Sequence, residues 1–226
     1  MEIDIDDGLY WLCARTDADL KAIEEYIDAN EVSPERITRV ATMLVERFAF
    51  EEQDFIMEHE REPMPHELII TGWVELFDLF ISKGLDPNLI VRESERLRYN
   101  IMHELFYMRN GNISLPILKK LLEIGGDPNL MLDDETLFDG VDFDIVFGAV
   151  EQEDRVFYAT WVMFWLLLLG YGGRLSNGTP PITMKNGYTY DVFKDYERLD
   201  FDFEVADNDW FIHVYFKDSR EEVGSL

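Results

Sequence analysis

Apart from carboxylates, few residues of this 226-residue chain could do chemistry. It has four histidines, one cysteine and 47 acidic residues. His59-Glu60 and His66-Glu67 each pair a histidine with a glutamate, but neither has the second histidine four residues later that a zinc protease helix requires. Residues 4–8 (DIDDG) lack the ligand spacing and the closing glutamate of a calcium loop. We therefore expect no metal site, no cofactor and no enzymatic activity.

The other reactive side chains fit structural roles better than catalytic ones. Cys13 stands in an apolar helix start, where a cysteine is typically a small core residue, and one cysteine allows no internal disulfide. His213 lies in a predicted strand, and His103 lies at a predicted helix start. A pocket with two carboxyl groups of strongly raised pKa would instead indicate an enzyme, an alternative that the sequence leaves open. Residues 1–11 lack a signal-peptide pattern, so we expect a cytoplasmic protein.

Acidic charge is the strongest functional signal in the composition. The chain has 47 acidic and 20 basic residues and a formal net charge of −27. Such a field repels nucleic acid and anionic membranes, and it speeds the encounter with a basic partner. We therefore expect a partner that is another protein, basic in charge, with no direct binding of nucleic acid or membrane. An acidic surface kept for solubility alone is the competing interpretation.

The acids are most concentrated in one segment, residues 133–154, which contains no Lys or Arg. Its nine acids are Asp133, Asp134, Glu135, Asp139, Asp142, Asp144, Glu151, Glu153 and Asp154. Acids near a helix N-terminus gain about 0.3–1 kcal/mol each, which would explain part of the run without any partner. The run could equally form a docking face for a basic protein.

The elements that position these acids are indicated by a repeated hexamer, Gly-x-Asp-Pro-Asn-Leu. It occurs in KGLDPNL and IGGDPNL, with Gly84 and Gly125 separated by 41 residues. Each copy follows an apolar stretch of helical period. A glycine suits the left-handed exit of a helix, and the proline three residues later prevents the helix from resuming. Each hexamer is therefore predicted to be a helix stop followed by a turn.

A third, degraded copy follows the apolar run 156–169 (VFYATWVMFWLLLL), with Gly170 aligned to Gly125 at a spacing of 45 residues. The run is shorter than the roughly 20 apolar residues of a membrane span, and acidic residues precede it. We expect a helix buried on all sides.

The flanking regions differ in kind, which predicts three parts: an N-terminal helical segment at 1–64, helix-pair repeats at 65–195 and a small β-hairpin at 196–226. In the first part, residues 16–30 and 33–48 have helical apolar spacing, with an aspartate cap before one and Ser33-Pro34 opening the other. In the last part, FDFEV, WFIHVYF and a third segment, EEVGS, alternate apolar and polar residues, as the strands of a β-hairpin or short meander do. Such a sheet could cap the last repeat.

The repeats resemble those of ankyrin-repeat proteins. Residues 100–103 (NIMH) and 136–139 (TLFD) stand where that family has Thr-Pro-Leu-His, and residues 186–193 (NGYTYDVF) are similar to its Asn-Gly-x-Thr turn into a short helix. The spacings of 41 and 45 residues exceed the family's usual ~33. The resemblance implies a mostly α, ankyrin-like solenoid of helix pairs joined by hairpin fingers, in which His103 is structural.

The resemblance also implies a function: a non-enzymatic scaffold that binds a protein through its fingers. The residues that we expect to contact the partner are Arg92, Glu93, Glu95, Arg96, Asp133, Asp134, Glu135, Asp139, Asp142 and Asp144. A small acidic scaffold of bacterial appearance is also what an immunity or antitoxin protein against a basic toxin would look like. The alternative is an acidic mimic of nucleic acid that inhibits a DNA- or RNA-binding protein, which needs carboxylates spaced like phosphates.

Overall fold

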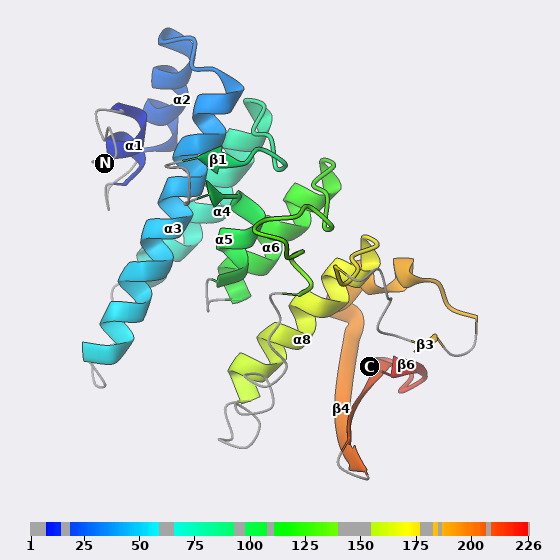
Figure 1. Cartoon of the computed structure of the whole chain (residues 1–226). Helices are drawn as coiled ribbons and strands as arrows, with labels where there is room; N and C mark the ends of the chain where they lie inside the picture. Colours follow the sequence, from blue (N-terminus) through cyan, green and yellow to red (C-terminus); the bar gives the residue numbers. More distant parts are fainter. Residues whose placement is uncertain are drawn as a thin grey trace. The chain divides into compact units, whose positions relative to one another are not determined.

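A computed structural model describes residues 8–14, 19–58, 66–92, 98–107, 111–139, 155–176, 183–184, 187–206 and 209–225 (Figure 1). The chain divides into an N-terminal unit, Met1–Asp127, and a C-terminal unit, Pro128–Leu226. The mostly α class and the C-terminal strands are as predicted. The stacking of helix pairs into a solenoid stays a prediction, as do the three part boundaries.

The N-terminal unit is helical apart from one short hairpin. Its elements are α1 (Gly8–Cys13), α2 (Leu20–Ala29), α3 (Pro34–Glu58), α4 (His66–Ser82), β1 (Val91–Arg92), β2 (Arg98–Tyr99), α5 (Ile101–Tyr107) and α6 (Gly111–Glu123). Two helices begin at the predicted caps: the Asp19 carboxylate accepts a bond from Lys21 N at 3.0 Å, and Ser33 Oγ accepts one from Arg36 N at 3.3 Å. Local chemistry therefore fixes both helix starts.

The core of this unit is built from the predicted apolar stripes. The buried residues of α3, α4 and α6 recur at helical spacing: Ile37, Val40, Ala41, Leu44, Val45, Leu76, Phe77, Phe80, Ile117, Leu118, Leu121 and Leu122. The short helix α5 is buried along its described length and packs against α3 and α6. Cys13 is also buried, as predicted.

The C-terminal unit combines one apolar helix with a small sheet. Its elements are α8 (Arg155–Gly170), β3 (Thr183–Met184), the 3₁₀ helix η1 (Tyr190–Arg198), β4 (Leu199–Ala206), β5 (Asp209–Phe216) and β6 (Glu222–Ser225). Burial on all sides was predicted for the whole apolar run and is found from Phe164 to Leu169, whereas Ala159, Thr160, Trp161 and Met163 are only partly buried. None of the helices in the described residues combines the length and the hydropathy needed to cross a membrane.

The sheet contains the predicted hairpin, and β6 is the third strand that a short meander through EEVGS would have. All its strands are antiparallel in the order β3-β6-β5-β4, so β5 is a central strand and the β4–β5 hairpin is extended on one side. Leu199, Ile212, Val214 and Val223 are buried, and η1 packs against both β4 and α8. The alternation of FDFEV and WFIHVYF correctly predicted the strands, but two-residue β3 carries no such pattern.

The hexamers form the predicted helix exits. Gly84 and Gly125 have φ of +92° and +101°, and Asp86-Pro87-Asn88 lies outside any helix or strand. In each exit the glycine N–H and the next N–H bond back to carbonyls of the last helical turn: Gly84 to Ile81, Leu85 to Phe80, Gly125 to Leu122 and Gly126 to Leu121.

The alignment of the third copy on Gly170 is wrong. It is Gly172 that has positive φ, +81°, and that bonds back to Leu169, while Gly173 bonds back to Leu168. The equivalent of Gly125 is therefore Gly172, which lies 47 residues later. Gly170 serves a different purpose, because a Cβ there would lie 2.5 Å from the backbone nitrogen of Lys194. It is the close approach of α8 to η1 that requires a glycine at this position.

Replacing Gly125 with valine is expected to destabilise the N-terminal unit by about 1 kcal/mol or more, because a branched side chain disfavours positive φ. A Cβ at this position meets no atom within 4 Å, so the backbone conformation alone should account for the loss. Thermal denaturation measures it. An unchanged melting temperature would contradict the assignment of Gly125 as a left-handed exit.

Candidate protein-binding fingers

The second finger, residues 131–135, is a tight hairpin with acids at its tip. Leu132 N donates to Glu135 O at 2.9 Å, and Glu135 N donates to Leu132 O at 3.1 Å. Between them Asp133 and Asp134 both have positive φ, 51° and 72°, as a type I′ turn requires. The resemblance to ankyrin repeats implied a fingertip for these acids, and in the structure they do lie at the tip of a tight turn.

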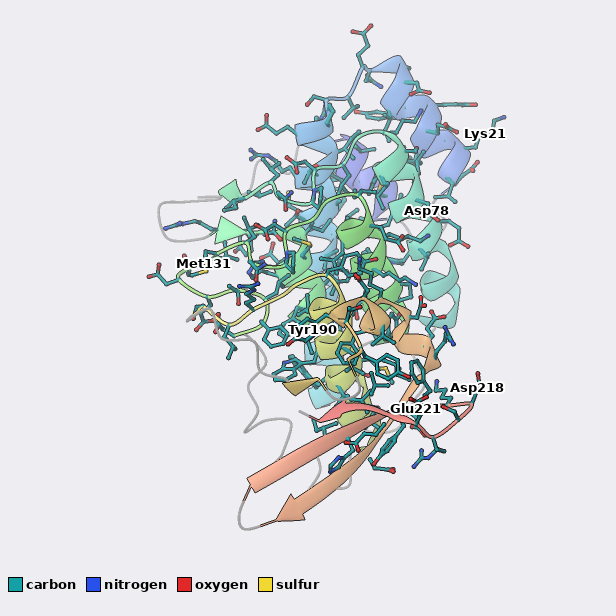
Figure 2. The ribbon with its side chains drawn as sticks, turned by 90° about the vertical axis from the view of Figure 1, so that its right-hand side faces the viewer. Lys21, Asp78, Met131, Tyr190, Asp218 and Glu221 are labelled. Carbon is teal, nitrogen blue, oxygen red and sulfur yellow. The ribbon has the colours of Figure 1, made fainter. Side chains whose placement is uncertain are left out.

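The finger also exposes an apolar side chain. Asp133, Asp134 and Glu135 are exposed, and Met131 is 44% exposed on the loop that leads into the turn (Figure 2). No hydrogen bond or ion pair of the Asp134 or Glu135 carboxylate is present within the described part of the chain. The finger thus presents a thioether beside a group of negative charges.

The first finger, residues 91–99, is a longer hairpin in the N-terminal unit. Its strands pair Val91 with Tyr99 and Arg92 with Arg98. Arg92, one of the expected contacts, ends β1. The other expected contacts of this finger, Glu93, Glu95 and Arg96, lie outside the described residues, as do Asp142 and Asp144.

The asparagine of each hexamer holds the next exit turn. Asn88 Nδ2 donates to Gly125 O at 3.0 Å, and Asn88 Oδ1 accepts from Asp127 N at 2.7 Å. In the C-terminal unit, Asn129 Nδ2 donates to Gly172 O at 3.2 Å, and Asn129 Oδ1 accepts from Arg174 N at 2.8 Å. One arrangement therefore occurs twice, and it independently matches Gly172 with Gly125.

The first exit turn is held in a related way by α3. Thr38 Oγ1 accepts a hydrogen bond from Asp86 N at 2.8 Å and donates one to Pro34 O at 2.9 Å. Thr38 is fully buried. The sequence signal for this contact was a polar residue on the core face of a helix, although its partner 48 residues away could not be named from that signal.

Asn100 ties α5 to the first exit turn and so to the base of the first finger. Its side chain is fully buried and donates to Pro87 O at 2.9 Å and Leu89 O at 3.1 Å. Its Oδ1 accepts from Met102 N at 2.9 Å, which caps α5 as predicted, and lies 3.3 Å from His103 Nδ1. His103 is buried against the cap, which is consistent with the structural role expected for it.

Thr136 and Asp139 form the corresponding cap after the second finger. Asp139 Oδ2 accepts from Thr136 N and Oγ1 at 2.8 and 2.7 Å, and the carboxylate also accepts from Ser176 N and Oγ. Partial burial raises the pKa of Asp139, but these bonds outweigh it, and the pKa lies below its ordinary value. Because its oxygens are engaged inside the unit, we leave Asp139 out of the docking surface. Residues 140–154 lie outside the described part of the chain.

Glu104 is a buried acid that the sequence pattern did not reveal. It is 9% exposed on α5, and burial together with the charge of Glu46 raises its pKa to about 7. A pKa near neutrality suits acid–base chemistry, but this carboxyl lies where α5 packs against α3, which restricts contact with a substrate. The available signal was a lone carboxylate in the run 101–106 (IMHELF), whose only other polar residue is His103.

The polar face of the C-terminal sheet carries a second group of charges. Arg220 donates to both Asp200 and Asp202, and its guanidinium lies 4.7 Å from the centroid of the Tyr215 ring. These contacts fasten the β5–β6 turn, which carries Asp218 and Glu221, to β4 (Figure 2). On central β5, His213 Nδ1 lies 2.9 Å from Glu222 Oε1, so this histidine is held within the sheet instead of at its edge.

No group of three or more His, Cys, Asp or Glu side chains within the described ranges could hold a metal ion. Comparison with protein-family models, with curated proteins and with solved structures finds no match for the chain. The likeness to ankyrin repeats therefore stays an expectation from the short sequence motifs.

Proposed function

We propose that the chain is a non-enzymatic protein-binding module whose second finger docks on a basic surface of another protein. The observation that carries this proposal is the tip, where consecutive exposed acids occupy a backbone-fixed turn. Type I′ turns favour Asn-Gly, because glycine and asparagine tolerate positive φ best. A sequence optimised for the turn alone would not place Asp133, Asp134 and Glu135 side by side, where their charges repel.

The neighbouring methionine supports a protein partner over mimicry of nucleic acid. A phosphate mimic needs carboxylates alone, whereas a protein interface combines an apolar centre with a charged rim. Methionine is enriched at protein interfaces because its flexible thioether adapts to its partner. Met131, 44% exposed beside the acids, fits that second description.

The proposal predicts a kinetic effect of charge reversal. Replacing Asp133, Asp134 and Glu135 with lysine should slow association with the partner at low salt by about tenfold or more, because opposite fields mainly raise the association rate. The melting temperature should change little, since the three side chains are exposed. At about 0.15 M salt the attraction is screened beyond roughly 8 Å, so added salt should reduce the difference.

The matched control carries the same change in net charge elsewhere: Glu75→Lys, Glu123→Lys and Asp218→Lys, all exposed. Proteins captured from native lysate by the wild type and by the control, but not by the finger variant, are the partners to purify for kinetics. Wild-type association rates in the finger variant would refute docking through this finger. Capture of a nucleic-acid-binding protein through its nucleic-acid site would favour the mimic.

A further inference from the structure

Glu104 lies in the N-terminal unit with its side chain largely withdrawn from water. The residue is 9% exposed, and within the described part of the chain its carboxyl has no hydrogen bond or ion pair. A carboxylate that packing largely shields from water is costlier to ionise, so the neutral form is favoured at this position. The charge state of Glu104 therefore bears directly on how well α5 fits the unit.

The neighbouring charges reinforce this preference. The helices that pack against α5 are α3 and α6. From α3, Glu46 repels the ionised form, while Arg39 is paired with Glu35. From α6, Lys120 is paired with Asp78 of α4.

The remaining charged or titratable groups of α5 and α6 do not offset the repulsion. Among the described side chains of these two helices they are Lys119 and Glu123 on α6 and His103 on α5, whose Nδ1 faces Asn100. Burial, followed by the charge of Glu46, raises the pKa of Glu104, and Lys120 is engaged by Asp78.

We propose that Glu104 is a proton-sensing group: protonated, it keeps α5 seated on α3, and its ionisation as the pH rises through neutrality loosens α5 and the first exit turn together. The link to the exit turn is Asn100, one helical turn before Glu104. Glu104 N donates to Asn100 O at 3.0 Å, and the Asn100 side chain holds Pro87 O and Leu89 O. Displacement of α5 would break these bonds at the base of the first finger.

The direction and size of the effect follow from proton linkage. The pKa of Glu104 is about 7 in the folded unit and 4.5 ordinarily, so the unfolded segment releases its proton first as the pH rises. Opening of α5 therefore becomes easier between about pH 4.5 and 7 and stays so above it. Between pH 6 and pH 8, this one group should raise the opening equilibrium constant about tenfold.

Hydrogen exchange of the full-length protein tests the proposal. The amides of Met102 and Glu104, corrected for intrinsic exchange, report the opening of α5. In the wild type the opening constant should rise about tenfold more between pH 6 and pH 8 than in Glu104→Gln, whose side chain is neutral at both values. Glu46→Gln should reduce the pH dependence in part, since it removes the repulsion and leaves the burial.

Glu123→Gln, an exposed acid on α6, serves as the control and should exchange as the wild type does at both pH values. Equal pH dependence in the wild type and Glu104→Gln would overturn the proposal. It would also be overturned if Glu123→Gln lost as much of the pH dependence as Glu104→Gln does. Should Glu104→Gln not fold, the Glu46→Gln comparison decides: an unchanged pH dependence in that variant would overturn the proposal. This test uses no partner, so its outcome is independent of docking by the second finger.

Discussion

Replacing Gly170 with valine is expected to destabilise the C-terminal unit by about 3 kcal/mol or more. A Cβ at this position would lie 2.5 Å from Lys194 N and 2.9 Å from the carbonyl carbon of Phe193, both backbone atoms of η1 that cannot rotate away. To accept the side chain, α8 and η1 must separate. That separation would open the core formed by Leu166, Leu169 and Phe193, which are almost completely buried.

Urea denaturation followed by tryptophan fluorescence measures this loss, because Trp165 lies in the same core and its indole stacks on Phe138 at 4.5 Å. The control is Gly172→Ala, where a Cβ meets no atom within 4 Å and only the positive φ is unfavourable. It should cost about 1 kcal/mol. Equal losses in Gly170→Val and Gly172→Ala would show that Gly170 is not a packing glycine.

The glycines of the three exits show which helix ends could be predicted from the sequence and which could not. Gly84 and Gly125 were predicted correctly as exits because each is followed by the same Asp-Pro-Asn, whose turn chemistry is local. In the third copy, Gly170, Gly172 and Gly173 all suit a helix exit. The choice among them depends on Asn129, which bonds Gly172 O from 43 residues away, and sequence spacing does not determine such a contact.

In the candidate site, too, some features were expected from the sequence, and others depend on contacts between residues far apart in the chain. The exposed position of Asp133 and Asp134 was expected, because the resemblance to ankyrin repeats places this segment at a fingertip. The internal role of Asp139 was not, because it depends on Ser176, which is distant in the sequence. Glu104 was missed because acids were read as surface residues in so acidic a chain. Burial of a carboxylate follows from how helices pack, and periodicity alone does not reveal it.

Thr38 and Asn88 play the same part at two different exit turns, and this shows how the exits relate to the fingers. Each finger follows directly on an exit turn whose backbone is held by a polar side chain from an earlier segment: Asp86 N by Thr38, and Asp127 N by Asn88. A finger that begins at a fixed turn loses less conformational entropy when it binds than a free loop would. The hydrogen bonds of the exits would therefore favour the docking proposed above, even though they lie away from the fingertips.

Replacing Asn100 with alanine is expected to destabilise the N-terminal unit by about 3–5 kcal/mol, because Pro87 O, Leu89 O and Met102 N would each lose a buried partner at roughly 1–3 kcal/mol apiece. The side chain is fully buried, so water cannot readily replace it. Asn100→Asp should be about as damaging. It keeps the acceptor for Met102 N but turns an oxygen toward the two carbonyls that now receive N–H bonds.

Chemical denaturation gives the loss in unfolding free energy, and hydrogen exchange of Leu89 and Met102 shows whether the exit turn and α5 loosen together. The matched control is Asn30→Ala, in which an exposed asparagine loses one side-chain bond, to Tyr26 O. It should cost a few tenths of a kcal/mol, since water replaces an exposed partner. If Asn100→Ala cost no more than Asn30→Ala, Asn100 would not be the link between α5 and the first exit turn. The first finger would then depend on its strand pairing, through Val91 and Tyr99, and on the bond from Asp86 N to Thr38 in the exit turn.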